Sequence, residues 1–178
     1  MSATDDGSVL GEENLGWERL ASNLRVERAL LGALDLLEGI PVVVFKGGLL
    51  TRRIYGDLRR RSSADNDLLV RKADAHEVLE RFANRGFVPH EGLDAHRALD
   101  RTGQVALWEN GDFDQPSVDL HVEPFPRNFF SVDEETIWTR LETVELHGRL
   151  VRTFDAPLTM AHLVSHFFQS LLEVRQLT

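Results

Sequence analysis

Hydrophobic positions in the first part of the chain follow first a helical and then a strand-like spacing. Between Glu13 and Leu37 apolar residues recur every three or four positions, and Gly39 follows, which predicts a long amphipathic helix. After Pro41 the unbroken run Val42-Val43-Val44-Phe45 is typical of a strand that is buried on both faces. We therefore expect a long helix that leads into a central strand.

The rest of the chain alternates strand-like and helical stretches. Residues 117–123 place Val118, Leu120 and Val122 on one face and polar residues on the other, which predicts a half-buried strand. The remaining segments predict strands over 68–70, 87–88 and 105–108, helices over 49–55, 137–141 and 158–174, a helix from Asp74 to Arg85, and a hairpin over 144–154 that turns at His147-Gly148. The pattern indicates an α/β (α+β) fold, with a small mixed β-sheet flanked by helices.

The length and composition suit one sizeable core. The chain has 178 residues, 42% of them hydrophobic, which is enough for a single domain. We expect residues 1–12 to form a flexible N-terminus, residues 13–156 to form the core with its N-terminal helix, and residues 157–178 to form a C-terminal helical segment. The polar, acidic N-terminus lacks a signal-peptide pattern, and no stretch approaches the ~18 apolar residues of a membrane span. We therefore expect a cytoplasmic protein without a membrane partner.

Composition also limits the chemistry. The absence of cysteine excludes disulfides and thiolate zinc sites, so any bound metal is held by carboxylate, imidazole or carbonyl groups. The formal net charge of −9 argues against a broad surface for binding nucleic acid. Seven basic residues nevertheless gather in one stretch, either as a solvated face or as a rim that attracts polyphosphate: Arg52, Arg53, Arg59, Arg60, Arg61, Arg71 and Lys72.

A glycine pair marks the first candidate site. Lys46-Gly47-Gly48 follows the first strand and precedes a helix. Glycines let the backbone approach a ligand, and the free N–H groups at a helix start attract an anion. The Walker spacing of a P-loop is absent, and a glycine pair alone more often marks a tight turn.

Three aspartates form the second candidate site. Asp65 and Asp67 begin a strand and share one face of it, so both carboxylates can bracket a divalent cation. Asp119 lies on the polar face of a later strand, with His121 beside it as a candidate auxiliary residue. Metal-assisted phosphoryl or nucleotidyl transfer needs carboxylates from separate strands to hold its cations. Because clustered carboxylates repel each other, Asp67→Asn is expected to leave the metal-free protein equally or more stable.

These motifs resemble a known family. From Val43 to about His166, the chain resembles the uncharacterised nucleotidyltransferase group of the DNA polymerase β-like superfamily. The shared motifs are Lys46-Gly47-Gly48, Arg61-Ser62-Ser63-Ala64-Asp65-Asn66-Asp67-Leu68-Leu69-Val70 and Val118-Asp119-Leu120-His121. The resemblance implies a nucleotidyltransferase-like core that transfers a nucleoside monophosphate from an NTP, with ATP as the expected donor and Mg²⁺ or Mn²⁺ as the metal.

The resemblance also implies a role for each motif. The two glycines would cradle the triphosphate, and Lys46 and Arg61 would contact phosphate. The aspartates would coordinate the metal ions, with Asp119 completing the catalytic site and helping to deprotonate the acceptor hydroxyl. The acceptor could be a small molecule, a peptide or protein side chain, or an RNA end. The acidic charge disfavours long nucleic acid, although a tRNA end could dock on the arginine-rich stretch.

Two departures from the family pattern motivate an alternative function. Asn66 occupies a position that is usually apolar, where an unpartnered amide would cost about 1–3 kcal/mol. The chain also stops within a helical region that continues in relatives, so residues 157–178 would be a truncated form of it. The alternative is a degenerate member that binds nucleotide or a partner protein without turnover.

Other sites are less well supported. His162 and His166 lie four residues apart on the last predicted helix and could chelate a metal. The pair lacks the intervening Glu of a metalloprotease motif, so we interpret both as core or interface histidines. Ser62-Ser63 has no His-Asp partners at a spacing that would support a serine hydrolase.

Overall fold

The computed structural model describes residues 6–126 and 132–176. Within these ranges the chain forms a seven-stranded sheet with the order β3-β4-β5-β2-β1-β7-β6. The strands are β1 (Val42–Val44), β2 (Asp65–Val70), β3 (Phe87–Pro89), β4 (Gln104–Glu109), β5 (Ser117–His121), β6 (Leu141–Leu146) and β7 (Arg149–Phe154). The helices are α1 (Asp6–Leu36), α2 (Gly47–Tyr55), α3 (Ala75–Asn84), α4 (Ala95–Thr102), α5 (Glu134–Thr139) and α6 (Ala156–Gln176), with a short 3₁₀ turn η1 (Lys72–Asp74).

The sheet is mixed, as the sequence predicts. β2 runs parallel to β5, and β1 runs parallel to β7. The other neighbouring strands are antiparallel, including the β6–β7 hairpin that turns between Leu146 and Arg149. The expected fold class is therefore confirmed.

Two hydrophobic layers cover the two faces of this sheet. Strand residues alternate between faces, so Leu68 and Val70 of β2 pack with α1 and α3, while Leu69 packs on the other face. The second layer joins Leu69 to Phe154 of β7 and Leu158 of α6. Asp67 shares the face of Leu69, and it therefore lies on the side of the sheet away from α1.

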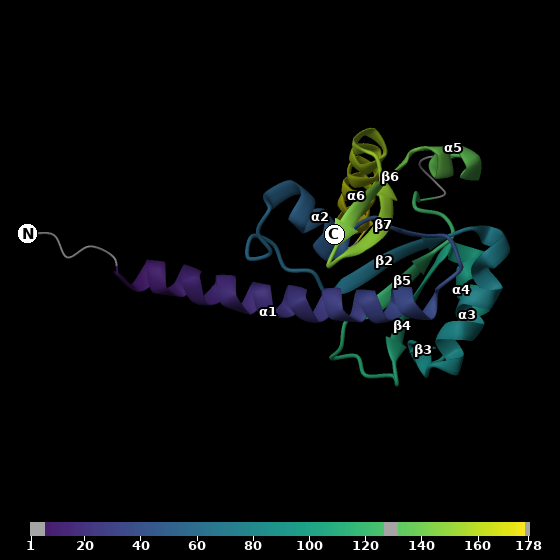
Figure 1. Cartoon of the computed structure of the whole chain (residues 1–178), viewed down its shortest axis with the longest axis horizontal. Coiled ribbons are helices and arrows are strands. Elements are labelled where there is room, and N and C mark those ends of the chain that lie inside the picture. Colours follow the sequence, from purple (N-terminus) through teal and green to yellow (C-terminus); the bar gives the residue numbers. More distant parts are fainter. Residues whose placement is uncertain (1–5, 127–131, 177–178) are drawn as a thin grey trace, which may run out of the picture.

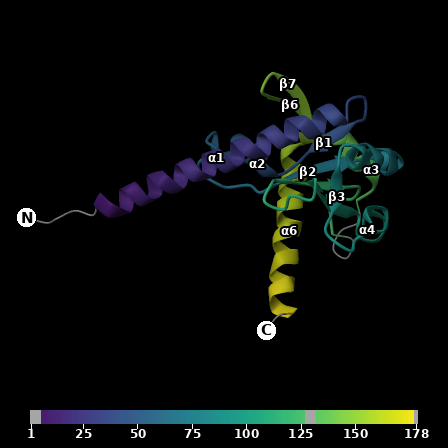
Figure 2. The same ribbon diagram turned by 90° about the horizontal axis from the view of Figure 1, so that it is seen from below.

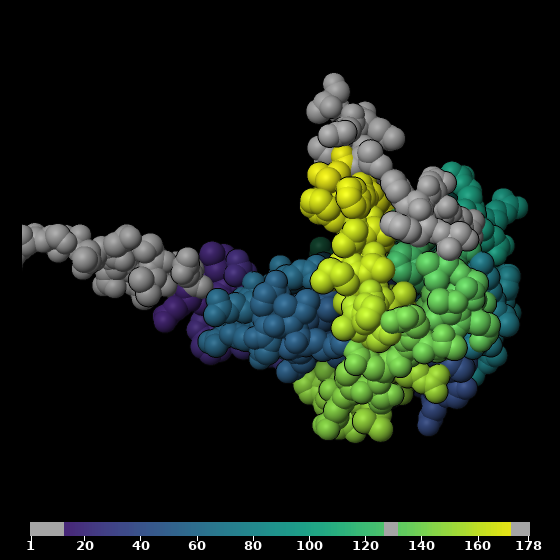
Figure 3. All heavy atoms as spheres, turned by 90° about the horizontal axis from the view of Figure 1, so that it is seen from above, coloured from purple at the N-terminus to yellow at the C-terminus, as the bar shows by residue number. Residues whose placement is uncertain are grey.

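Two long helices extend from the compact body. The N-terminal half of α1 projects to one side, and α6 projects in a different direction (Figures 1 and 2). Figure 3 shows the surface of α6, coloured yellow, standing out beside the rest of the molecule. No helix in the described ranges is long and apolar enough to cross a membrane.

Several element boundaries differ from those expected. The first helix begins at Asp6 rather than Glu13, while residues 1–5 of the expected flexible N-terminus lie outside the described ranges. Asp74 precedes α3, but its side chain makes no capping hydrogen bond. The expected helix over 137–141 instead spans Glu134–Thr139, because the Asp133 side chain accepts a hydrogen bond from the Thr136 N–H and caps the helix earlier.

One helix was not predicted. α4 is short and mostly polar, although Ala95, Ala98 and Leu99 recur at helical spacing and Leu99 is buried. The helix is nevertheless well delimited, since Asp94 accepts a hydrogen bond from the Arg97 N–H at 3.0 Å and Gly103 ends the helix with φ +80°. An apolar pattern that covers only eight residues is too short to distinguish a helix from a loop by spacing alone.

Candidate active site

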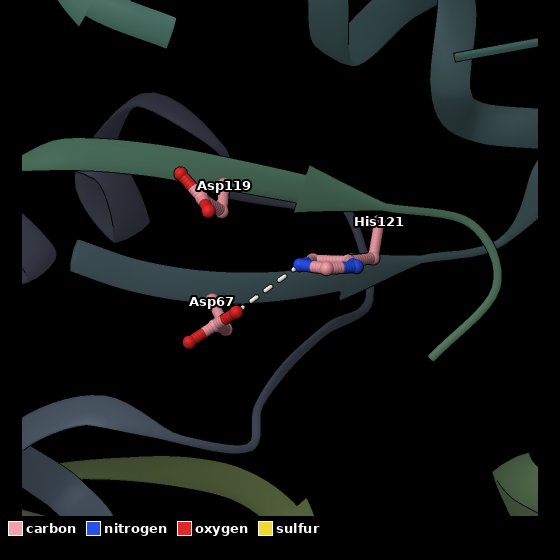
Figure 4. A group of neighbouring side chains, drawn as sticks. All are labelled: Asp67, Asp119 and His121. Carbon is pink, nitrogen blue, oxygen red and sulfur yellow. Dashed lines mark hydrogen bonds and ion pairs between the residues drawn. The ribbon is translucent and has the colours of Figure 1, made fainter. Parts of the chain in front are cut away.

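The candidate site lies where β2 and β5 run side by side. In this parallel ladder Asp67 is paired with Asp119, and Leu69 is paired with His121. Alternation along both strands places the two aspartates and His121 on the same face (Figure 4). Ligand atoms of Asp67, Asp119 and His121 all lie within 4.8 Å of one another.

Asp67 is the most buried member of this group, with 1% of its surface exposed. Its Oδ1 lies 2.6 Å from Lys46 Nζ and 3.1 Å from His121 Nε2. An ionised carboxylate can only accept hydrogen bonds, so His121 Nε2 carries the shared proton. Burial raises the pKa of Asp67, but the hydrogen bond from His121 and the charge of Lys46 outweigh it and hold the pKa below its usual value.

The second oxygen of Asp67 has a different environment. Oδ2 is fully buried and has no hydrogen-bond partner among the described residues. An unpartnered carboxylate oxygen in a protein interior is costly, because water no longer solvates it. Oδ2 is therefore the atom of this site that is best suited to bind a cation.

Asp119 and Asp65 carry the remaining negative charge. Burial raises the pKa of Asp119, and the charges of Asp67 and Asp65 raise it further. Burial and the charge of Asp67 likewise raise the pKa of Asp65, although Lys46 and Arg61 act in the opposite direction. These carboxylates therefore repel one another, and a divalent cation would relieve the repulsion.

The closest cluster differs from the expected aspartate triad. Among the described residues it consists of Asp67, Asp119 and His121, and Asp65 lies outside it. Asp65 is paired with Ser117, two residues along β2 from Asp67 and on the same face. The Ser117 hydroxyl donates a hydrogen bond to Asp119 Oδ1 at 3.0 Å, so it orients the neighbouring aspartate.

The donor set fits a hard divalent cation. Carboxylate oxygens predominate, and imidazole is the remaining donor. Asp67 Oδ2 and the Asp119 carboxylate could hold the ion, with Asp65 close enough for its charge to act on both. His121 already donates to Asp67, so in this arrangement it orients a ligand of the ion.

The glycine turn is packed tightly against the beginning of β2. Gly47 has a φ of +64°, and a Cβ added to it would lie 2.9 Å from the backbone oxygen of Asp65. Only glycine suits both conditions. α2 begins here, and the side chain of its N-cap residue Lys46 makes no capping hydrogen bond. The first N–H groups of α2 are thus left without a side-chain cap, at a helix end that favours an anion.

A buried acidic residue of α1 packs against the start of α2. Glu27 of α1 is 2% exposed, and its carboxylate accepts hydrogen bonds from Arg52 of α2 and from His147 in the β6–β7 turn. Glu27 also lies directly against Gly48, where an added Cβ would be 3.4 Å from its Cγ. Glu27 was missed from the sequence, although a carboxylate on the apolar face of an amphipathic helix is a signal that could have identified it.

The two residues expected to contact phosphate, Lys46 and Arg61, lie in different environments. Lys46 contacts Asp67, and Arg61 is exposed near Asp65. Most of the basic stretch is occupied by ion pairs with Glu27, Asp57, Glu123, Glu134, Glu135 and Glu142. In the described part of the chain, Arg60 and Arg61 are the members of the stretch without an ion pair. The proposed polyphosphate rim is therefore reduced to these two residues.

Asn66 satisfies its hydrogen-bonding requirement. It is buried on the face opposite Asp67, and its amide donates to the backbone oxygen of Val26 at 3.0 Å. The prediction that Asn66 is not an unpartnered amide is confirmed. This position therefore gives no reason to regard the site as degenerate.

α6 closes the site with a buried histidine. His162 packs edge-on against Phe45 at 5.1 Å, so its interpretation as a core residue is confirmed. Burial lowers the pKa of His162 to about 3, with smaller contributions from the charges of Lys46 and His121. Neutral His162 also lines a polar cavity of about 240 Å³ that contains Lys46 and Asp119.

Comparisons with known proteins bear on the family and the fold of the chain. Residues 18–178 match the family described as "Uncharacterised nucleotidyltransferase". The fold is similar to the crystal structure of a "putative nucleotidyltransferase" from Thermotoga maritima, with a TM-score of 0.53 and 15% identity, over 84% of this chain and 89% of that one. No curated protein matches the sequence. Because the family match spans most of the sequence, the chain belongs to the uncharacterised nucleotidyltransferase family.

Proposed function

We propose that the protein transfers a nucleoside monophosphate from an NTP to a hydroxyl-type acceptor and releases pyrophosphate. The observation that carries this proposal is the buried Asp67, whose Oδ2 has no partner among the described residues. Asp67 is paired with Asp119 across the ladder, and its Oδ1 contacts Lys46, the N-cap residue of α2. A cation-binding carboxylate pair next to an anion-binding helix end is the combination that a metal-bound triphosphate needs.

The cations would be held by Asp67 and Asp119, with Asp65 as the third carboxylate. Bound Mg²⁺ or Mn²⁺ would neutralise the charge that develops on the phosphates. On the protein side, the backbone N–H groups of Gly47 and Gly48 would bind the β- and γ-phosphates. Arg61, exposed and near Asp65, would add a cationic contact.

Asp119 is the proposed general base. Asp119 lines the polar cavity beside the proposed metal site, so its carboxylate can reach an acceptor hydroxyl that binds there. The acceptor oxygen forms a bond to the α-phosphorus, and the bond from that phosphorus to the pyrophosphate oxygen breaks. The acceptor proton passes to Asp119. Most of the rate would come from positioning and charge neutralisation.

The test is pyrophosphate release with each of the four NTPs, in the presence of Mg²⁺ or Mn²⁺ and a panel of alcohol, peptide and RNA acceptors. We expect release with at least one NTP, with ATP as the first choice, and loss of release in Asp67→Asn. Nucleotide binding should be measured in parallel by calorimetry. Tight binding without release under any of these conditions would instead support a nucleotide-binding protein without turnover.

A further inference from the structure

Asp119 lies on the border between two cavities. One is the polar cavity of about 240 Å³ that also contains Lys46 and His121. The other, of about 520 Å³, extends over β4 and α4 and is lined by apolar side chains such as Leu93 and Trp108 together with the charged Asp94, Arg97 and Arg101. Asp119, Thr102 and Gln104 line both cavities, so the two spaces meet at the proposed general base.

The ladder explains why the second cavity lies on the catalytic face. Ala106 of β4 is paired with Asp119 of β5, and Asp119 is in turn paired with Asp67 of β2. Alternation along β4 therefore places Trp108 on the same face as the aspartates, while Leu107 is buried in the opposite layer. The small side chain of Ala106 leaves space directly beside Asp119.

The order of the strands indicates which reactant would bind in the second cavity. β1, which leads into the glycine turn, and β4 lie on opposite sides of the β2–β5 pair. In-line displacement requires the attacking and leaving oxygens to lie on opposite sides of the α-phosphorus. If the pyrophosphate binds at the start of α2, the attacking group must approach from the side of β4, where this cavity lies.

The lining indicates the class of molecule that would bind. Trp108 packs against Phe113 at 5.0 Å, and the exposed Leu93 lies on the same cavity, which suits a ring or another flat apolar group. Arg97 lies at the rim, and its side chain is 90% exposed. Arg97 Nε forms a long ion pair with Asp94 Oδ2 at 3.9 Å, while the exposed remainder of the guanidinium can contact a negatively charged group.

The volume favours a small molecule. About 520 Å³ falls within the usual range for small-molecule sites. RNA strands are instead bound along extended basic grooves that follow several phosphates. We propose that this cavity binds the acceptor, a small hydroxyl compound with an apolar or aromatic ring and an anionic group, and presents its hydroxyl to Asp119. This inference rests on the proposed nucleotidyl transfer.

The experiment uses 8-anilinonaphthalene-1-sulfonate, a fluorescent aromatic anion, as the probe. We expect one saturable site whose Kd rises at least about fivefold in Trp108→Ala and in Arg97→Glu. Trp17→Ala and Arg19→Glu are matched controls on the exposed part of α1, and they should leave the Kd unchanged. Circular dichroism of every variant establishes that it is folded.

A second arm repeats the titration with Mg²⁺ and a saturating non-hydrolysable ATP analogue. We expect the probe and the analogue to bind together, because they occupy different cavities. Displacement of the probe would identify the cavity as the nucleoside site and overturn the proposal. Equal Kd values for Trp108→Ala, Arg97→Glu and the controls would also overturn it. If the analogue itself does not bind, the proposed nucleotidyl transfer fails, whereas the variants still decide whether the cavity binds an aromatic anion.

A third arm follows label from α-labelled ATP into separate metabolite, RNA and protein fractions of a cell extract. We expect label in a small-molecule product. The amount of metabolite fraction that gives half-maximal labelling should rise severalfold in Arg97→Glu and stay unchanged in Arg19→Glu. Label that appears only in RNA or protein would contradict a small-molecule acceptor while leaving nucleotidyl transfer intact.

Discussion

Lys46 Nζ lies 2.6 Å from Oδ1 of Asp67, so the single lysine of the glycine turn is the counter-charge of the most buried carboxylate in the site. The backbone strengthens this contact, since the N–H of Phe45 donates to the backbone oxygen of Asp67. Lys46 was expected to bind phosphate. The observed pairing indicates that it balances the metal-free site and must release Asp67, at least in part, if it is to contact a nucleotide.

Replacing Lys46 should therefore increase the affinity for metal. In Lys46→Met, a cation no longer has to overcome a neighbouring positive charge, and we expect Mn²⁺ to bind about three- to tenfold more tightly without nucleotide. Electron paramagnetic resonance measures free Mn²⁺ directly. Lys72→Met is the control, because the only other lysine pairs with Glu123. Unchanged or weaker Mn²⁺ binding in Lys46→Met would show that Lys46 does not compete with the cation.

The aspartates of the site should respond differently to neutralisation. The sequence alone predicts that Asp67→Asn leaves the metal-free protein equally or more stable. The contacts of Asp67 change this expectation, because Lys46 and His121 favour its charged form. We now expect Asp67→Asn to lose about 1–2 kcal/mol of unfolding free energy at neutral pH.

Asp119→Asn should have the opposite effect. Burial and neighbouring carboxylates raise the pKa of Asp119, so its charge costs stability at neutral pH. Removing that charge should stabilise the metal-free protein by up to about 1 kcal/mol. The gain should vanish below the pKa of the unfolded carboxyl, near pH ~4, where both states are protonated. Urea unfolding in EDTA at two pH values measures the free energy of unfolding. An equal loss of unfolding free energy in Asp67→Asn and Asp119→Asn would contradict the different environments that we assign to the two carboxylates.

His162 should make the fold sensitive to mild acid. Its folded pKa of about 3 lies below the ordinary value of 6.5, so the unfolded state takes up a proton that the native state cannot. Stability should therefore fall as the pH drops below 6.5. His162→Phe removes this contribution. Between pH 7.5 and pH 5 its free energy of unfolding should therefore fall by about 2 kcal/mol less than that of the wild type. Urea unfolding at the two pH values provides the measurement, and identical losses would show that His162 can be protonated in the native protein.

Gly47 should tolerate no side chain. An added Cβ meets a positive φ and also the backbone oxygen of Asp65, so Gly47→Ala should cost about 2–4 kcal/mol and weaken NTP binding. Gly39→Ala is a matched control, with φ +85° but no atom within 4 Å of the added Cβ. It should cost only about 1 kcal/mol and leave NTP binding unchanged. Similar thermal unfolding of the two variants would mean that the turn can move away from β2.

The sequence predicted the strands of the site better than their contacts. Alternation around Asp119 and the buried run after Asp67 identified β5 and β2, because both strands have strongly patterned faces. Spacing alone could not show that these strands are neighbours. That expectation came from the family resemblance, and the parallel pairing of Asp67 with Asp119 agrees with it.

Interactions between distant elements were not predictable in this way. The ion pair of Lys46 with Asp67 and the burial of Glu27 beneath Gly48 depend on how α1, α2 and β2 pack. α4 was missed although Ala95, Ala98 and Leu99 recur at helical spacing, because the helix is short and mostly polar. α4 nevertheless contributes Arg97, Ala98, Arg101 and Thr102 to the cavity beside Asp119, so a helix that the sequence did not predict forms part of the proposed acceptor site.

The central claim is that Asp67 and Asp119 support metal-dependent nucleotidyl transfer. The most direct measurement is pyrophosphate release from NTP with Mg²⁺ and acceptor, compared among the wild type, Asp67→Asn, Asp119→Asn and the exposed-loop control Asp114→Asn. We expect release by the wild type and the control, and a loss of at least about 100-fold in each site variant, with a much smaller loss of NTP affinity. Wild-type rates in either site variant, or NTP binding without release in the wild type, would contradict the claim.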